Sequence, residues 1–298
     1  MSIKHIVALS GGESSAIVGV EVARKFGIEN LVLLNHDINP KVEPADVKRF
    51  KQEVADYLGL SITYANHPDW ETETPISLCV KAGTWINPNG RAILCTHRLK
   101  TAPFYDWLEK NYQHGYCHYA EYQEAVIIES DICYYGFDAN EPARITRRSN
   151  IMGQSGFKTD YPLALWQERT IHNIEEIGIA KPTAYSLFNH ANCIGCLKAG
   201  WQHWYVIYCN YPDVYQQLID GESSIGYAVH GVDDWAEDKA EMFESMKRAG
   251  IEPTEKTPSA QFWARAKKAL ATQAAGQFDL FGLPTMEASV ECTGDCKL

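Results

Sequence analysis

Residues 8–15 read Ala8-Leu9-Ser10-Gly11-Gly12-Glu13-Ser14-Ser15, and they join an apolar strand pattern to the start of a helix. Two glycines and three hydroxyls at such a turn let backbone N–H groups converge on an anion, with the positive end of the helix dipole behind them. The stretch therefore predicts a phosphate-binding loop, and an ordinary turn is the alternative. It is not a P-loop, because no Gly-Lys-Ser/Thr closes it, and it lacks the G-x-G-x-x-G of a dinucleotide site.

The beginning of the chain alternates strand and helix patterns. Strands are expected at residues 3–9, 31–35 and 61–65, and helices at residues 13–26 and 46–58. Apolar residues recur at helical spacing in both helices, and a glycine follows each of them. This order predicts the α/β class with a doubly wound parallel sheet. Ligands of such sheets lie beyond the carboxyl ends of the strands, where both the 10–15 loop and Asp37 fall.

The remainder of the chain is mainly helical in pattern. Residues 67–94 lack periodicity and are interpreted as a long functional loop or lid. Further elements are expected at 100–111 (helix), 132–137 (strand), and 170–177, 201–219, 233–249 and 259–275 (helices). The aromatic residues between Trp201 and Tyr211 are expected to pack in a core, with a base-stacking platform as the alternative. We predict a nucleotide-binding domain at residues 1–200, a helical region at 201–275 and an irregular tail at 276–298.

Composition narrows the class of protein. The chain has 298 residues, a formal net charge of -11 and nine cysteines. The acidic balance argues against tight, sequence-independent binding of nucleic acid, which depends on Lys and Arg. No apolar run approaches the roughly 18 residues of a membrane span, and the first residues show no signal-peptide pattern, so a cytoplasmic protein is expected. The odd cysteine count favours thiols, a metal site or redox chemistry over a disulfide framework.

Five motifs occur in order along the chain. They are Ser10-Gly-Gly-x-x-Ser15, Cys95-Thr96-His97-Arg98-Leu99-Lys100 with Pro103, Gly136-Phe137-Asp138-Ala139-Asn140-Glu141-Pro142-Ala143-Arg144, Tyr161-Pro162-Leu163 with Trp166, and Cys193-Ile194-Gly195-Cys196-Leu197-Lys198. This ordered set resembles the phosphoadenosine phosphosulfate (PAPS) reductase-like family of the PP-loop ATP pyrophosphatase superfamily. It is closest to phage and mobile-element members, and it is similar to the ATP pyrophosphatase component of DNA phosphorothioation systems. The resemblance implies an adenine nucleotide alpha-hydrolase-like, Rossmann-like fold.

The resemblance implies an adenine nucleotide, ATP or a relative, with its phosphates on the 10–15 loop and Mg2+ as cofactor. The residues implied to bind it are Ser10, Gly11, Gly12, Ser14, Ser15, Asp37 and Asp138. Glu13 and Ser14 stand where the family more often has Lys and Asp, so a cation for the phosphates and a carboxylate for magnesium are missing. Arg98, Lys100 and Arg144 are the candidate catalytic cations, because a Lys or an Arg fork neutralises phosphate oxygens. For each of them a structural ion pair is the alternative, and Asp138 with Glu141 either holds magnesium or orients Arg144.

Cysteines form the second group of candidates. Cys193 and Cys196 have the spacing of a thiolate pair that binds one metal ion or cluster. The resemblance adds Cys95 as a third ligand, whereas Thr96 stands where the iron–sulfur members have another cysteine. A [4Fe-4S] cluster is expected, and a structural Zn2+ or buried thiols without a metal are the alternatives. The candidates for a fourth ligand are Cys209, Cys292 and Cys296, while Cys79, Cys117 and Cys133 are expected in the core.

Three functions follow from the resemblance. The favoured one is an ATP pyrophosphatase that adenylates a nucleic-acid acceptor for sulfur transfer, as in DNA phosphorothioation or RNA thiolation. A cysteine desulfurase and a protein that presents the nucleic acid are its expected partners. The alternatives are a thioredoxin-dependent PAPS or adenosine phosphosulfate reductase and a catalytically inactive nucleotide-binding regulatory subunit. The first is favoured because residues 291–296 match the reductases' Glu-Cys-Gly nucleophile segment poorly.

Overall fold

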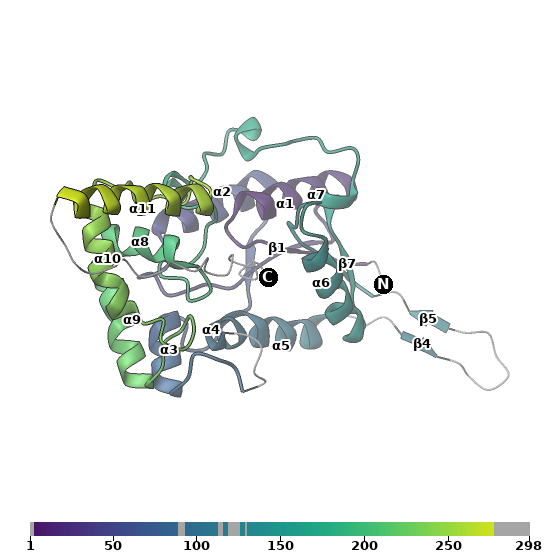
Figure 1. Cartoon of the computed structure of the whole chain (residues 1–298). Helices are drawn as coiled ribbons and strands as arrows, with labels where there is room; N and C mark the ends of the chain where they lie inside the picture. Colours follow the sequence, from purple (N-terminus) through teal and green to yellow (C-terminus); the bar gives the residue numbers. More distant parts are fainter. Residues whose placement is uncertain (1–2, 89–92, 113–115, 119–125, 129, 277–298) are drawn as a thin grey trace.

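The computed structural model describes residues 3–88, 93–112, 116–118, 126–128 and 130–276 (Figure 1). Five parallel strands form the central sheet in the order β3-β2-β1-β6-β7. They are β1 (His5–Ala8), β2 (Leu31–Asn35), β3 (Ile62–Tyr64), β6 (Ile132–Tyr134) and β7 (Lys158–Asp160). Strands β4 (Tyr116–His118) and β5 (Val126–Ile128) form a separate antiparallel ribbon. The prediction of a doubly wound parallel sheet is confirmed.

Helices cover both faces of the sheet. On one face α1 (Glu13–Phe26) and α2 (Ala45–Leu58) pack against Val7 and Leu33, and on the other α5 (Ala102–Asn111) and α6 (Pro142–Gln154) pack against Ile6 and Leu34 (Figure 1). Neighbouring strand residues serve opposite faces because successive side chains alternate. Both faces are thereby covered, and the carboxyl ends of β1 and β2 stay available for a site.

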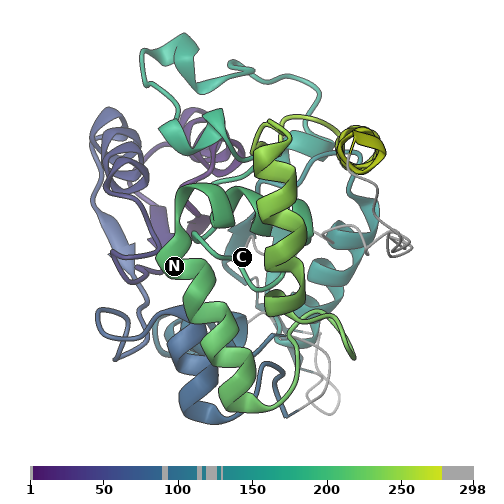
Figure 2. The same cartoon turned by 60° about the vertical axis from the view of Figure 1, so that its left-hand side comes forward.

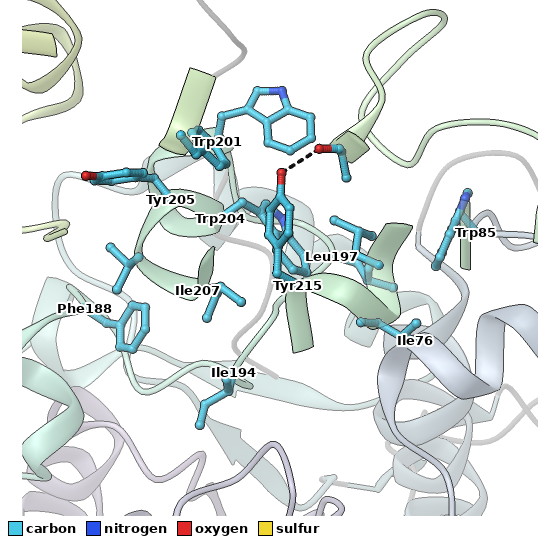
Figure 3. Close-up of a cluster of buried hydrophobic side chains, with 14 of the residues drawn as sticks. Ile76, Trp85, Phe188, Ile194, Leu197, Trp201, Trp204, Tyr205, Ile207 and Tyr215 are labelled. Carbon is cyan, nitrogen blue, oxygen red and sulfur yellow. Dashed lines mark hydrogen bonds between the residues drawn. The ribbon is translucent and has the colours of Figure 1, made fainter. Parts of the chain in front are cut away.

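A second core lies among the C-terminal helices. It joins α8 (Trp201–Asn210), α9 (Pro212–Ile225), α10 (Ala236–Arg248) and α11 (Ser259–Gly276) to α3 (Pro75–Ala82), which runs alongside α9 (Figures 1 and 2). Trp204 and Tyr205 are fully buried, and Tyr215 Oη donates to the Ala236 carbonyl oxygen at 2.6 Å (Figure 3). The expectation that these aromatic residues pack as core is therefore confirmed.

Short elements complete the described chain. They are α4 (Leu94–Thr96), the π-helical turn η1 (His97–Thr101), α7 (Pro162–Leu165) and the 3-10 turns η2 (Ile174–Ile177) and η3 (Thr183–Ser186). Within the described residues, no helix combines the length and the apolar content that crossing a membrane requires. The helix expected at 100–111 starts earlier, through α4 and η1, and the strand expected at 132–137 is shorter.

Residues 67–94 are not one irregular loop, because they contain α3. Thr74 caps this helix: its Oγ1 accepts from Ser77 N at 3.1 Å, and Ser77 Oγ accepts from Thr74 N at 2.8 Å. Pro75 occupies the first turn, where a missing N–H does no harm. The helix has eight residues, too few for a clear apolar period, so its signals lie at its two ends, in the capping box with Pro75 and in Gly83.

Two predicted helices were wrong. In the segment 170–177 only η2 is helical, because Asn173 caps it at one end and Gly178 ends it after a single turn. The N–H groups of Thr170 and Ile171 donate instead to Glu21 Oε1, at 2.7 and 2.9 Å. The expected helix 201–219 is two helices, since Pro212 lacks a backbone donor and starts α9.

The three arginines Arg144, Arg147 and Arg148 lie on α6. Neither α6 nor β7 was predicted from the sequence. Helix α1 and strand β2, in contrast, have the predicted bounds, and α2 begins one residue before its predicted start.

Candidate functional site

The loop of residues 10–15 lies between β1 and α1, at the carboxyl edge of the sheet. Ser15 is buried, and its Oγ accepts from Ser10 N at 3.1 Å and donates to the Gly12 carbonyl oxygen at 2.8 Å. Gly11 has a φ of +82°, and a Cβ there would lie 2.7 Å from Val47 Cγ1 on α2. The loop is a tight backbone turn that Ser15 braces from within and that packs directly on α2.

Gly136, just beyond β6, approaches the same loop. A Cβ on Gly136 would lie 2.8 Å from Ser14 C and 2.9 Å from Ser15 N, so no larger residue fits without a shift of the backbone. Ser14 itself is half-buried in the first turn of α1. The third sequence motif therefore begins with a residue whose absent side chain lets the segment after β6 approach the first turn of α1.

Glu13, one of the two loop residues that differ from the pattern of the resembled family, is turned toward a later segment. Its Oε1 accepts from Lys181 Nζ at 3.0 Å and from Ile174 N at 3.2 Å. Its backbone N–H donates to Tyr185 Oη at 3.0 Å. Tyr185 thus contacts the 10–15 loop through a hydroxyl that retains its own proton to donate. Sequence reasoning missed this residue, because 172 positions separate the two partners.

The larger described pocket opens where β1 and β2 end. We call it the nucleotide pocket after the ligand that the sequence resemblance implies. Its empty volume, including space open to solvent, is about 490 Å³. It is lined by Ala8, Leu9, Ser10, Leu34, Asn35, His36, Ile38, Glu43, Val47, Lys100, Ala191, Asn192 and Cys193. Of the predicted residues it brings together Ser10, Lys100 and Cys193, which come from three separate motifs.

Asp37 follows β2 and is part of a charged cluster beside this pocket. Its Oδ1 lies 2.9 Å from Lys48 Nζ and 3.8 Å from Lys51 Nζ. Lys51 is fully buried and donates to Asn35 Oδ1 and to both carboxylate oxygens of Glu43, each at 3.0 Å. Burial raises the pKa of Glu43, and the Lys51 charge opposes that shift. Two lysines therefore already neutralise Asp37, whose predicted ligand role stays a prediction.

A second pocket, the thiol pocket, gathers all three predicted cysteine ligands. It is lined by Pro75, Cys95, Thr96, Leu99, Lys100, Cys193, Cys196, Leu197 and Lys198. Cys95 comes from α4, whereas Cys193 and Cys196 flank a turn that precedes α8. Lys100 and Cys193 line both pockets. The nucleotide pocket and the thiol pocket thus share a wall.

Cys79 was expected to be a core residue, and it is fully buried. Its thiol is hydrogen-bonded to Cys95, which lines the thiol pocket. This bond lowers the pKa of the Cys79 thiol, and burial opposes the shift. Cys209 instead contacts Tyr205 on α8, where burial raises its pKa. Cys133 is buried as expected, while the Cys117 side chain and Cys292 with Cys296 lie outside the described residues.

Thiolates suit Zn2+ or an iron–sulfur cluster, so the donor types of the thiol pocket fit the implied cofactors. In the part of the chain that the structure describes, however, no group of three His, Cys, Asp or Glu side chains is arranged to hold a metal ion. Metal binding at this pocket therefore stays a prediction, which the metal content of the purified protein tests.

Buried His203 and half-buried Glu255 form a pair that holds the turn that carries Cys196. His203 Nε2 lies 3.4 Å from Cys196 N, and Nδ1 lies 2.8 Å from Glu255 Oε1. Because a backbone N–H can only donate, Nε2 accepts and Nδ1 carries the proton. Burial alone would raise the pKa of Glu255, but the hydrogen bond from His203 brings it below its ordinary value. Sequence reasoning missed both residues, since only their tertiary position relates them to the cysteines.

The remaining predicted cations and acids lie away from the two pockets. The Arg144 guanidinium pairs with Glu141 and lies 4.2 Å from the centre of the Phe137 ring. Glu141 also accepts from the Asp138 backbone N–H at 3.0 Å, so it links Arg144 to the start of the third motif. Arg98 is exposed on η1. Lys100 alone of the three candidate cations lines the described pockets.

No family model, curated protein or solved structure matches this chain. Function is therefore proposed from the motifs and from the geometry described above.

Proposed function

We propose that the chain is an adenine-nucleotide-binding PP-loop enzyme that splits ATP into AMP and pyrophosphate while it adenylates a nucleic-acid acceptor for sulfur transfer. The observation that carries this proposal is the shared wall between the nucleotide pocket and the thiol pocket, made by Lys100 and Cys193. A phosphate-binding loop beside three thiols is the arrangement that couples phosphate activation to sulfur chemistry.

The reaction requires a cation near the loop. An acceptor oxygen attacks the α-phosphorus, the bond to the oxygen that bridges to the β-phosphorus breaks, and pyrophosphate leaves with that electron pair. A sulfur nucleophile then displaces AMP from the adenylated acceptor. Negative charge develops on the leaving pyrophosphate, and a fixed cation lowers this barrier. Lys100 lines the same pocket as Ser10 and fits this role. Mg2+ bound with the nucleotide supplies further neutralisation.

A second candidate function has an observation of its own. The Glu13 carboxylate points to Lys181, so the position where the family more often has a phosphate-binding lysine contributes no cation to the loop. This favours a protein that binds an adenine nucleotide without turning it over, as a regulatory or assembly subunit would.

Turnover separates the two candidates. The enzyme is expected to release AMP and pyrophosphate in equal amounts from ATP and Mg2+, in the presence of a nucleic acid and a cysteine desulfurase. Chromatography of the nucleotides with a coupled pyrophosphate assay measures this directly. ADP and phosphate as products would exclude the proposed chemistry, and nucleotide binding without any product would favour the second candidate.

Substitution of Lys100 tests the assignment of the cation. Lys100→Met is expected to lower turnover by roughly 100-fold, the effect of losing one transition-state charge contact. Lys110→Met is the matched control, because Lys110 is exposed near the end of the neighbouring α5 and lines neither pocket. Equal rates for the Lys100 variant and the wild type would remove this role.

Metal content tests the cysteine assignment. Anaerobically purified protein is expected to contain either iron with sulfide or one zinc, since thiolates select these metals. Each of the variants Cys95→Ser, Cys193→Ser and Cys196→Ser is expected to lose this metal. Cys133→Ser is the control, because Cys133 is buried in the sheet core and lines neither pocket. Cys79 is not a suitable control, given its hydrogen bond with Cys95. Metal-free, folded wild-type protein would leave these cysteines without a ligand role.

A further inference from the structure

His36 directly follows β2 and lines the nucleotide pocket together with Ser10 and Lys100. The side chain is buried, with 3% of the residue surface exposed. The proposed reaction assigns it no role. A buried polar ring in a ligand pocket calls for an account of both of its nitrogens.

One ring nitrogen already has a partner. His36 Nδ1 is hydrogen-bonded to the Ala65 carbonyl oxygen. A carbonyl oxygen only accepts, so Nδ1 carries the proton and Nε2 presents a lone pair. Burial lowers the pKa of His36 to about 4; the Ala65 bond opposes this shift, and the charges of Lys100 and Lys51 add to it. The ring is therefore neutral at neutral pH, and Nε2 acts as an acceptor only.

The other nitrogen lacks a partner. Nε2 is shielded from water, and within the described residues it has no hydrogen-bond partner. The loop side of the pocket is suited to phosphates, which at neutral pH carry few protons to donate. The donors of an adenine nucleotide are the ribose hydroxyls and the amino group of the base. Nε2 thus matches the nucleoside part of such a ligand.

The sheet indicates which nucleoside group reaches His36. β1, which leads into the phosphate-binding loop, is the direct neighbour of β2, and adjacent strands lie roughly 4.8 Å apart. Next to the α-phosphate along ATP comes the ribose, so a nucleotide held at the end of β1 brings its sugar to the end of β2. The base lies one group farther on.

We propose that His36 Nε2 accepts a hydrogen bond from a ribose hydroxyl of the bound nucleotide, and that His36 thereby selects nucleotides that carry this hydroxyl over the deoxy analogue that lacks it. This inference rests on the proposed function in one respect, namely that an adenine nucleotide occupies this pocket.

The experiment measures the affinity of the full chain for ATP, 2′-deoxy-ATP, 3′-deoxy-ATP and ITP by calorimetry. Wild-type protein is expected to bind ATP roughly 3- to 10-fold more tightly than one of the deoxy analogues, the usual effect of one hydrogen bond. His36→Leu is expected to bind ATP and that analogue equally, and His36→Gln, which keeps an acceptor, is expected to recover part of the preference. His172→Leu, at an exposed position, is expected to keep the wild-type preference.

Other outcomes overturn the inference. Equal wild-type affinity for ATP and both deoxy analogues would exclude a ribose contact, and this arm needs no variant that must fold. ITP lacks the amino group of the adenine base. If the wild type bound ATP more tightly than ITP, and His36→Leu alone lost this preference, Nε2 would be assigned to the base instead of the ribose. Wild-type protein that binds none of these nucleotides would overturn the proposed function together with this inference. Ribose selection without ATP turnover would support the inference and contradict the enzyme.

Discussion

Gly11→Val is expected to abolish adenine-nucleotide binding. The variant places a branched side chain at a φ of +82°, where its Cβ would lie 2.7 Å from Val47 Cγ1. The loop must then move, and the backbone N–H groups that we propose to bind the phosphates lose their common direction. Losing two charge-assisted hydrogen bonds at about 1.5–3 kcal/mol each reduces the affinity by roughly 100-fold or more. Calorimetric titration of folded variant protein with ATP measures the effect.

Gly59→Val separates this loss from simple backbone strain. Gly59 has a φ of +67°, yet a Cβ there meets no atom within 4 Å, and the residue lies at the far end of α2. This control should lose stability through strain alone and bind ATP as the wild type does. Undiminished ATP affinity in folded Gly11→Val protein would refute the phosphate-binding role of the loop.

Lys51→Met is expected to lower the free energy of unfolding by about 3–5 kcal/mol, because it leaves a buried carboxylate without its counter-ion. Lys51 is fully buried and donates to both oxygens of Glu43 at 3.0 Å. It also lies under the phosphate-binding loop, where a Cβ on Gly11 would come within 3.5 Å of its side chain. Chemical denaturation followed by circular dichroism measures the change.

The loss has a defined pH dependence. Burial raises the pKa of Glu43 above its ordinary 4.5, and the Lys51 charge limits that rise, so the variant carboxyl has a higher pKa still. A folded state that binds the proton more tightly than the unfolded chain loses stability as the pH rises through this range. Lys51→Met should therefore be closer to the wild type at pH 5 than at pH 8.

Two further variants test the cause. The double variant Lys51→Met with Glu43→Gln removes the buried charge and should recover most of the stability. Lys48→Met removes a partly exposed lysine of the same helix, 2.9 Å from Asp37, and should cost about 1 kcal/mol or less. A Lys51 variant as stable as Lys48→Met at pH 8 would contradict the counter-ion role.

Several site residues were predictable because their motifs are local. Ser10, Gly11 and Gly12 lie where a strand meets a helix, and that junction is visible from apolar periodicity alone. The grouping of Cys95 with Cys193 and Cys196 followed from the resemblance in motif order, and all three line one pocket. Arg98 and Arg144 were predicted from charge and motif, yet neither lines a described pocket. Arg98 is exposed, and Arg144 pairs with Glu141.

Other features had no local signal. Tyr185 meets the loop from 172 residues away, and Glu255 reaches His203 across 52 residues. The helix expected at 170–177 failed for the same reason, because Glu21 on α1 takes the N–H groups of Thr170 and Ile171. Such contacts are decided by which elements pack together, which periodicity within one segment does not encode.

The sequence by itself determined the alternation of strands and helices over residues 3–65, the glycine-rich turn at residues 10–15 and the parallel sheet, because backbone preference and apolar period act within about ten residues. Tertiary structure decided what surrounds that turn. It turned Glu13 toward Lys181, buried Lys51 against Glu43 and, among the residues that the structure describes, left His36 Nε2 without a hydrogen-bond partner. It also made Lys100 and Cys193 the wall between two pockets. The physical reason is that hydrogen bonds and charges at strand ends find their partners only after distant segments have packed, so their roles depend on the assembled layers.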